Sequence, residues 1–192
     1  MRATHTAWFI GVLWSFHALV VHSAGGDAEA GRRKTVTCNG CHGQASLQSV
    51  PKLGGQRGAY FISAMRAYQD GKREHATMRD VAKAYSDKEL KNFAAYYSQF
   101  GKLEIIGTPV IDKPVTAASC EGCHGPEGRL PSNHESAVLA GQKSSYLKAA
   151  LREYRDGTRP HAVMQAAVAN LTDDEIDVMS DYYARLEGLE VK

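Results

Sequence analysis

The chain has 192 residues and is close to electrically balanced, with 23 Lys and Arg against 21 Asp and Glu and a formal net charge of +2. This balance gives no bulk positive charge for nucleic acid, so we expect no nucleic-acid partner. Only one long apolar stretch is present, at the N-terminus, which excludes a protein with several membrane spans.

Residues 1–24 have the pattern of a secretory signal peptide. One basic residue precedes an apolar stretch from Ala7 to Val21, and the small residues Ser23 and Ala24 follow as in a cleavage motif. The stretch of about 15 apolar residues, interrupted by His17, is shorter than the roughly 20 that span a bilayer, so a permanent anchor is the weaker alternative. We expect cleavage near residue 24 and export of a soluble mature chain to the periplasm.

The pentapeptide Cys-x-x-Cys-His occurs twice, at residues 38–42 and 120–124, and uses every cysteine in the chain. Two thiols three residues apart on a helical turn can each add to one vinyl group of a haem, and the histidine that follows lies under the iron. The pattern predicts two covalently bound haem c groups. The expected attachment residues are Cys38, Cys41, Cys120 and Cys123, and the expected iron ligands are His42 and His124.

The same cysteines allow three other interpretations. A Cys-x-x-Cys pair can be a thiol redox centre or half of a zinc site, and four cysteines can form two disulfides. A thiol redox centre gives no reason for a histidine after both pairs. Cys41 and Cys123 are too far apart in the sequence for an ordinary zinc ribbon, so covalent haem is the favoured interpretation.

An internal repeat divides the chain into two homologous parts. Residues 53–97 align without a gap onto residues 139–183 at a constant offset of 86. The aligned pairs include Tyr60 with Tyr146, Tyr68 with Tyr154, Gly71 with Gly157 and Arg73 with Arg159. The repeat predicts one domain at residues 25–100 and a second at residues 114–192, joined by a linker at residues 101–113 that is rich in turn residues.

Each part is predicted to be helical, and no alternating strand pattern competes. An apolar and aromatic stripe along residues 60–68 and its repeat marks one helix of each part, which ends at the aligned glycine. Ser86-x-x-Glu89 and Thr172-x-x-Glu175 are capping boxes that begin a second helix. The predicted fold class is therefore all-α. Domains this small have a marginal core, so each haem is expected to form part of it.

The repeat also selects candidates for the sixth iron ligand. Met78 aligns with Met164, whereas the other two methionines of the mature chain, Met65 and Met179, align with Leu or Phe and behave as core residues. We expect both aligned methionines to lie on loops between the two helices of each part. The competing ligands are the aligned histidines His75 and His161, since imidazole also binds iron well.

The second part differs from the first around its haem motif. It has only residues 114–119 where the first part has a helix at residues 27–37, and it carries four extra residues within residues 125–137. Ala137 stands where the first part has Pro51, which leaves open how a backbone carbonyl holds the His124 ring.

The aligned arginines and tyrosines each have two interpretations. Arg73 and Arg159 follow the capping glycines, where they could pair with haem propionates or act as favourable cations at a helix C-terminus. The tyrosine stripes are interpreted as core residues rather than as electron relays.

Taken together, these features resemble the dihaem cytochromes c of the c4 type, which are built from two class I cytochrome c domains. The resemblance covers essentially all of the mature chain. It rests on the segment at residues 26–31, both haem motifs with the glycine that follows, Leu-Gly-Gly-Gln at 53–56, Leu-Ala-Gly-Gln at 139–142 and the two methionine segments. It implies that His42 with Met78, and His124 with Met164, ligate two neighbouring haems.

The resemblance also implies a function. It implies a periplasmic carrier of single electrons between respiratory complexes or dehydrogenases and a terminal acceptor such as an oxidase. Redox proteins are then the partners, with peripheral contact to membrane complexes. Methionine as the sixth ligand completes the coordination of both irons and raises their reduction potential. An electron-transfer protein without catalytic residues is therefore expected.

Two other functions remain as alternatives. An electron-accepting subunit of a larger dehydrogenase or oxidase complex would keep the same haem residues. A dihaem redox enzyme is less favoured, because it needs an open iron site or a special ligand such as cysteine.

The charge is distributed unevenly along the chain. Lys and Arg outnumber Asp and Glu by 12 to 7 in residues 25–100, whereas Asp and Glu outnumber Lys and Arg by 12 to 8 in residues 114–192. Opposite fields could steer two different partners to the two ends. The candidate docking residues are Arg32, Arg33 and Lys34 at one end and Asp173, Asp174 and Asp177 at the other.

Overall fold

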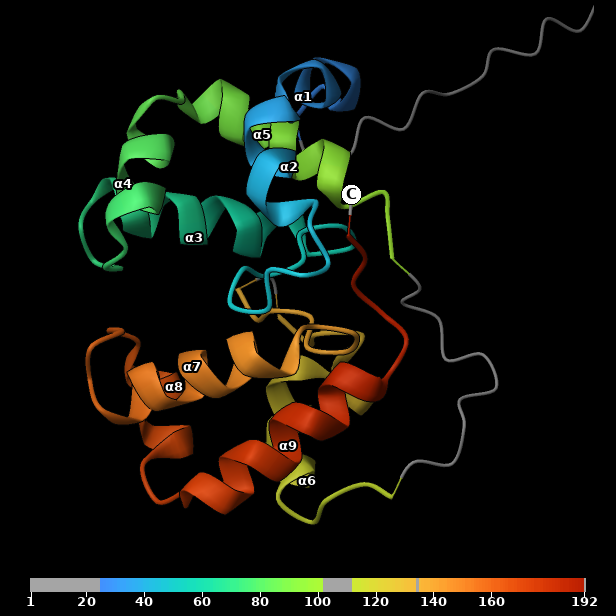
Figure 1. Cartoon of the computed structure of the whole chain (residues 1–192), viewed down its shortest axis with the longest axis vertical. Coiled ribbons are helices and arrows are strands. Elements are labelled where there is room, and N and C mark those ends of the chain that lie inside the picture. Colours follow the sequence, from blue (N-terminus) through green and yellow to red (C-terminus); the bar gives the residue numbers. More distant parts are fainter. Residues whose placement is uncertain (1–24, 102–111, 134, 192) are drawn as a thin grey trace, which may run out of the picture.

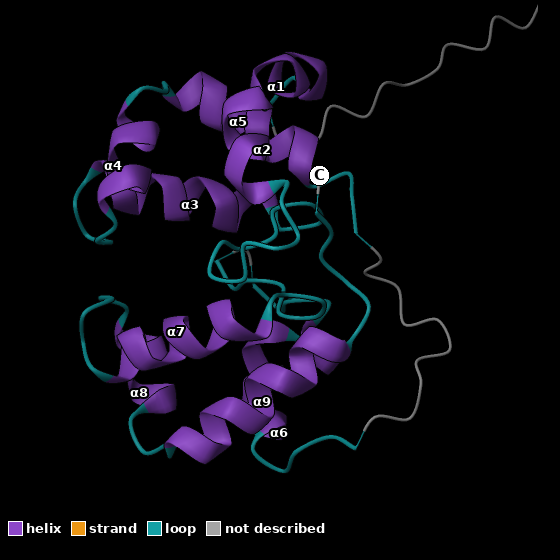
Figure 2. Ribbon diagram, viewed as in Figure 1, coloured by secondary structure: helices purple, strands orange, loops and turns teal. Residues whose placement is uncertain are grey.

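The computed structural model describes residues 25–101, 112–133 and 135–191, and these are helical with connecting loops (Figures 1 and 2). The predicted signal peptide and most of the predicted linker lie outside the described residues, so these boundaries stay predictions. The N-terminal half, residues 25–101, contains α1 (Ala28–Lys34), α2 (Val36–His42), α3 (Gly58–Gln69), α4 (Ala76–Lys83) and α5 (Asp87–Tyr97). The C-terminal half, from residue 112 onward, contains α6 (Ala117–His124), the 3-10 turn η1 (Pro126–Gly128), α7 (Ser144–Arg155), α8 (Ala162–Val168) and α9 (Asp173–Arg185).

The repeat found in the sequence is a repeat of structure. Helices α3, α4 and α5 recur as α7, α8 and α9, and both capping boxes form, with Ser86 and Thr172 as the N-caps of α5 and α9. Gly71 and Gly157 follow the ends of α3 and α7 with φ of 70° and 80°. Glycine enters this left-handed region without steric cost, so the predicted helix ends are confirmed.

The core of the N-terminal half is aromatic. Phe61, Phe93 and Tyr97 are buried between α3 and α5, together with Met65 and Leu90. Each fully buried side chain of this size contributes about 1.5–3 kcal/mol. Helix α1 packs on α5 at a very short distance, because a Cβ at Gly31 would lie 2.2 Å from the Asn92 carbonyl oxygen. Only glycine permits this contact, which fixes the segment that leads into the first haem motif.

The two halves are joined by a reciprocal pair of side-chain amides from the Leu-x-Gly-Gln segments. Gln56 accepts from the Val138 backbone N–H at 2.9 Å and donates to the Val138 carbonyl at 3.2 Å. Gln142 makes the same two bonds to Lys52, at 2.8 and 3.1 Å. Lys52 and Val138 are themselves 86 residues apart, so a pseudo-twofold relation connects the halves.

The end of the chain returns to the N-terminal half (Figure 1). Gly54 and Glu190 exchange two backbone hydrogen bonds of 3.2 and 2.8 Å in an isolated antiparallel bridge. This bridge adds a backbone contact between the halves to the two glutamine contacts. Among the described helices, none has the length and apolar character required to cross a membrane.

Candidate functional site

The first haem motif lies on α2, and its histidine is oriented by a backbone carbonyl. His42 Nδ1 lies 2.8 Å from the carbonyl oxygen of Pro51. That contact fixes the tautomer with the proton on Nδ1 and leaves Nε2 with a free electron pair, the form that binds iron. Burial lowers the pKa of His42 and the bond to Pro51 opposes this. Cys38 and Cys41 form no disulfide, and Cys38 packs against the aromatic core.

The second motif lies on α6 and reaches the same geometry without a proline. His124 is buried, and its Nδ1 lies 2.7 Å from the carbonyl oxygen of Ala137. Burial lowers the pKa of His124, as it does for His42. The question left open by the sequence is thus answered, because the carbonyl group and not the proline ring makes the contact.

The four extra residues of the second part form a compact loop beside its motif. The Ser132 backbone N–H donates to the Cys123 carbonyl at 3.0 Å, and the Ser132 hydroxyl donates to the Gly122 carbonyl at 3.0 Å. Gly125 has φ of 77°, and a Cβ there would lie 1.9 Å from the Leu130 carbonyl oxygen. The insertion therefore closes back on the motif, where the first half has no equivalent.

The candidate sixth ligands lie in short helices, so the expectation that they lie in loops was wrong. Met78 is in the first turn of α4 and Met164 in the first turn of α8, and both are half-buried. The short helices begin there because His75 and His161 act as N-caps. Their Nδ1 atoms accept from the Met78 and Met164 backbone N–H groups at 3.3 and 3.2 Å.

These contacts distinguish the two types of candidate ligand. Each competing histidine is exposed and already uses one ring nitrogen within its own helix cap. The other two methionines of the mature chain, Met65 and Met179, are 6% and 1% exposed and lie in the hydrophobic interior, as the alignment predicted.

The two aligned arginines make contacts that the sequence analysis did not foresee. Arg73 donates to the Tyr146 hydroxyl at 2.9 Å, and Arg159 donates to the Tyr60 hydroxyl at 3.1 Å. Each guanidinium therefore crosses to the opposite half. It also stacks on a tyrosine ring of its own half, Arg73 on Tyr68 at 4.5 Å and Arg159 on Tyr154 at 4.4 Å. The alignment of Tyr60 with Tyr146 was the available signal, but it gave no indication that the pairs cross.

The residues around both motifs fit a haem in several independent ways. Each motif offers two cysteines outside any disulfide and a histidine whose Nδ1 is already bonded, and a half-buried methionine lies in the same half. Arg79 Nε and Arg159 Nη1 are buried without a hydrogen-bond acceptor among the described residues. Haem propionates would supply such acceptors. By contrast, no group of three or more His, Cys, Asp or Glu within the described parts of the chain is placed to hold a metal ion.

Tyr146 lies between two guanidinium groups and has an altered acidity. Burial alone would raise its pKa, but Arg73 and Arg159 outweigh burial and lower the pKa to about 8. A phenol whose pKa falls on folding stabilises the folded state above its unfolded pKa of about 10, and this contribution is lost as the pH falls through 8. We therefore expect contact between the halves to strengthen between pH 8 and 10, by an amount on the order of 2 kcal/mol.

Carbon NMR of tyrosines labelled at Cζ measures this ionisation directly. One phenol should titrate near pH 8, and the Tyr146→Phe variant should lose that signal while Tyr60→Phe keeps it. If every phenol titrates at or above the ordinary value near 10, the two guanidiniums do not act on Tyr146 as the geometry indicates.

Comparisons with known proteins agree with this site. No family model matches the chain. Cytochrome c4 of Pseudomonas aeruginosa is 30% identical over 184 residues, which cover 86% of this chain and 90% of that protein. A thiosulfate dehydrogenase electron acceptor of Thiomonas intermedia is 27% identical and covers 79% of each chain. The crystal structure of reduced recombinant cytochrome c4 from Pseudomonas stutzeri superposes with a TM-score of 0.70 at 26% identity and covers 84% of this chain and 99% of that one.

Proposed function

Because this chain belongs to the cytochrome c4 family, and is therefore a dihaem electron-transfer protein rather than an enzyme, we propose that it carries single electrons in the periplasm from respiratory complexes or dehydrogenases to an oxidase. One observation supports this most directly. In both halves a histidine ring is oriented by a carbonyl group at 2.7–2.8 Å, and a half-buried methionine lies in the first turn of a short helix in the same half. A closed pair of axial ligands suits electron transfer without substrate binding.

We assign the ligands of each haem accordingly. In the N-terminal half, Cys38 and Cys41 would hold the porphyrin, and His42 and Met78 would bind its iron. In the C-terminal half, the corresponding residues are Cys120, Cys123, His124 and Met164. These residues would orient the imidazole and exclude water from the iron, and the haem would supply the one-electron chemistry.

A second function is favoured by one comparison. A relative is named as the electron acceptor of thiosulfate dehydrogenase, so this chain could serve as the accepting subunit of one dehydrogenase instead of a free carrier. Native purification from the periplasmic fraction, followed by mass measurement, separates the two functions. Recovery as a free monomer supports the carrier, whereas stable co-purification with one dehydrogenase supports the subunit.

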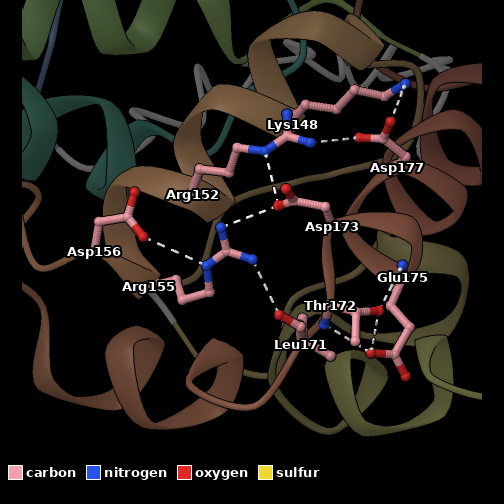
Figure 3. A network of polar contacts seen from close by, with 9 residues as sticks. All are labelled: Lys148, Arg152, Arg155, Asp156, Leu171, Thr172, Asp173, Glu175 and Asp177. Atoms are coloured by element: carbon pink, nitrogen blue, oxygen red, sulfur yellow. Dashed lines mark hydrogen bonds and ion pairs between the residues drawn. The ribbon is translucent and has the colours of Figure 1, made fainter.

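The structure changes the choice of residues for testing the two-ended docking hypothesis. Arg32 and Arg33 lie within ion-pair distance of Glu29, and Lys34 pairs with Glu89. At the other end, Asp173 accepts from Arg152 and Arg155 at 3.2 and 3.0 Å, and Asp177 accepts from Arg152 at 3.0 Å (Figure 3). Reversing these charges would disturb internal contacts as well as the surface field.

Other charged residues provide a cleaner test. Lys83, Lys88 and Lys91 in the N-terminal half, and Glu135 and Asp174 in the C-terminal half, are exposed and form no ion pair among the described residues. Reversing the three lysines should slow electron transfer with one partner by about tenfold at low salt, and reversing the two acids should slow transfer with the other.

Stopped-flow rates at increasing ionic strength measure this effect. Both wild-type rates should fall as salt rises, because the Debye length is about 10 Å at 0.1 M. If both sets of charge reversals slow electron transfer with the same partner, or if the rates do not change with salt concentration, docking is one-sided. The electron-transfer function itself is then unaffected.

A further inference from the structure

We propose that residues 186–190, which follow α9, form a latch that holds the two halves as one rigid body, and that release of this latch from Gly54 slows the passage of an electron between the halves. The effect on electron transfer rests on the proposed carrier function. The latch itself rests on the contacts that the segment makes with both halves.

Consecutive residues of the segment bond to equivalent positions of the two halves. As the chain runs from α9 towards the N-terminal half (Figure 1), the Leu189 N–H donates to the Ala140 carbonyl of the C-terminal half at 2.9 Å. The Glu190 N–H then donates to the Gly54 carbonyl at 2.8 Å, and Glu190 accepts from the Gly54 N–H at 3.2 Å. Gly54 and Ala140 are 86 residues apart, which is the offset of the repeat. The segment therefore holds the same backbone position in each half.

Both halves also pack closely on the segment at Gly188. A Cβ at Gly188 would lie 2.2 Å from the Ala140 carbonyl oxygen. From the N-terminal half, a Cβ at Gly101 would lie 2.9 Å from the Gly188 carbonyl oxygen. Gly188 is not among the described glycines with positive φ, so close contact and not backbone conformation requires glycine there. The two halves thus meet the segment from opposite sides.

The segment is attached more firmly to the C-terminal half than to the N-terminal half. Leu186 is 5% exposed and packs in the hydrophobic core of the C-terminal half. The buried Arg129 guanidinium donates to the Glu187 carbonyl. The hydrogen bonds to the N-terminal half are the two of the Gly54 bridge, and exchanging such bonds for bonds to water changes the free energy little. The latch should therefore open at Gly54 and stay on the C-terminal half.

The other connections between the halves restrict their relative motion less. Ten residues, 102–111, join the described parts, and a chain of that length reaches up to about 35 Å. Among the described residues, the bridge between Gly54 and Glu190 provides the backbone-to-backbone hydrogen bonds across the interface. Its other hydrogen bonds involve a side chain, as where Lys143 Nζ donates to the Gln44 carbonyl in the loop after the first haem motif. Rotatable side chains allow movement that a paired backbone does not.

A fixed relation between the halves matters for the proposed function, because electron tunnelling slows steeply as the gap between two redox centres widens. The internal step moves one electron from the ferrous centre of one half to the ferric centre of the other, so it needs no further oxidant or reductant. Release of the latch should slow this step and leave each centre able to react with outside partners.

Two variants open the latch, and a third is the matched control. Glu190→Pro removes the N–H that donates to Gly54, and truncation after Leu189 removes the bridge without introducing a proline. Val191→Pro is the control, because the Val191 N–H makes no backbone hydrogen bond within the described residues. A proline there also favours an extended residue 190, which suits the bridge.

Residual dipolar couplings of the reduced holoprotein measure whether the halves move together. One alignment tensor should fit both halves in the wild type and in Val191→Pro, whereas Glu190→Pro and the truncated chain should each need two. The Gly54 amide should exchange with solvent about tenfold faster in both opened variants. Unchanged amide exchange within α5 and α9 would show that both halves remain folded. A single tensor in both opened variants, or two tensors in Val191→Pro as well, would overturn the latch.

The internal electron-transfer rate is measured separately, after rapid reduction of the holoprotein by less than one electron per molecule. It should fall severalfold in both opened variants and stay at the wild-type value in Val191→Pro. Two tensors with an unchanged rate would reject the effect of the latch on electron transfer. If the wild-type protein lacks two reversible one-electron steps, the carrier function fails, while the dipolar couplings still decide the latch.

Discussion

Replacing Cys120 and Cys123 by alanine should leave one covalently bound haem per molecule where the wild-type protein has two. The four cysteines lie in two separate motifs, and within each motif two thiols hold one haem. The matched variant, with Cys38 and Cys41 replaced by alanine, should lose the other haem. Acid-acetone extraction followed by mass measurement of the protein checks both, and a thiol assay should find no free thiol in the wild type.

Loss of a haem should also destabilise the half that held it. Cys38 and Cys120 both pack against the hydrophobic core of their own half. A half that lacks its haem loses a large apolar body from a core that is already small for an independent domain. We expect the affected half to unfold at a much lower temperature while the other half keeps its haem spectrum. Two extractable haems, or bound zinc in the wild-type protein, would contradict the haem assignment.

Replacing Met78 by alanine should remove about half of the weak far-red sulfur-to-iron band of the ferric protein, and Met164→Ala should remove the other half. The effect is large because the band requires a thioether on the iron, and each methionine is proposed to supply one. Loss of the ligand should also lower the potential of the affected haem, because an axial methionine raises it. Absorption spectroscopy and redox titration of the two single variants measure both consequences.

His75→Ala is the matched control for Met78→Ala. It removes the Nδ1 that caps α4, which costs about 1 kcal/mol, but it should leave the far-red band in place. If instead both methionine variants keep the wild-type spectrum, the sixth ligands are His75 and His161. A high-spin fraction in the wild-type protein at neutral pH would favour the redox-enzyme alternative, because it indicates an open iron site.

Features governed by short stretches of sequence could be predicted without the structure. The haem motifs, both capping boxes and the helix ends at Gly71 and Gly157 depend on residues within one or two helical turns of each other. The separation of core methionines from candidate ligands also came from sequence, because a repeat without gaps compares each residue with its counterpart. The composition of each half gave the charge difference directly.

Contacts between the halves were decided only by the tertiary structure. The crossing of Arg73 to Tyr146, the pairing of Gln56 with the backbone of Val138 and the reach of Lys143 into the first haem loop join residues 73 to 99 positions apart. No local pattern encodes such distances, since their geometry depends on how two folded bodies meet. The Met78 segment was misjudged for a related reason. A histidine side chain forms the cap that starts its short helix, and histidine is not among the residues that usually indicate a helix start.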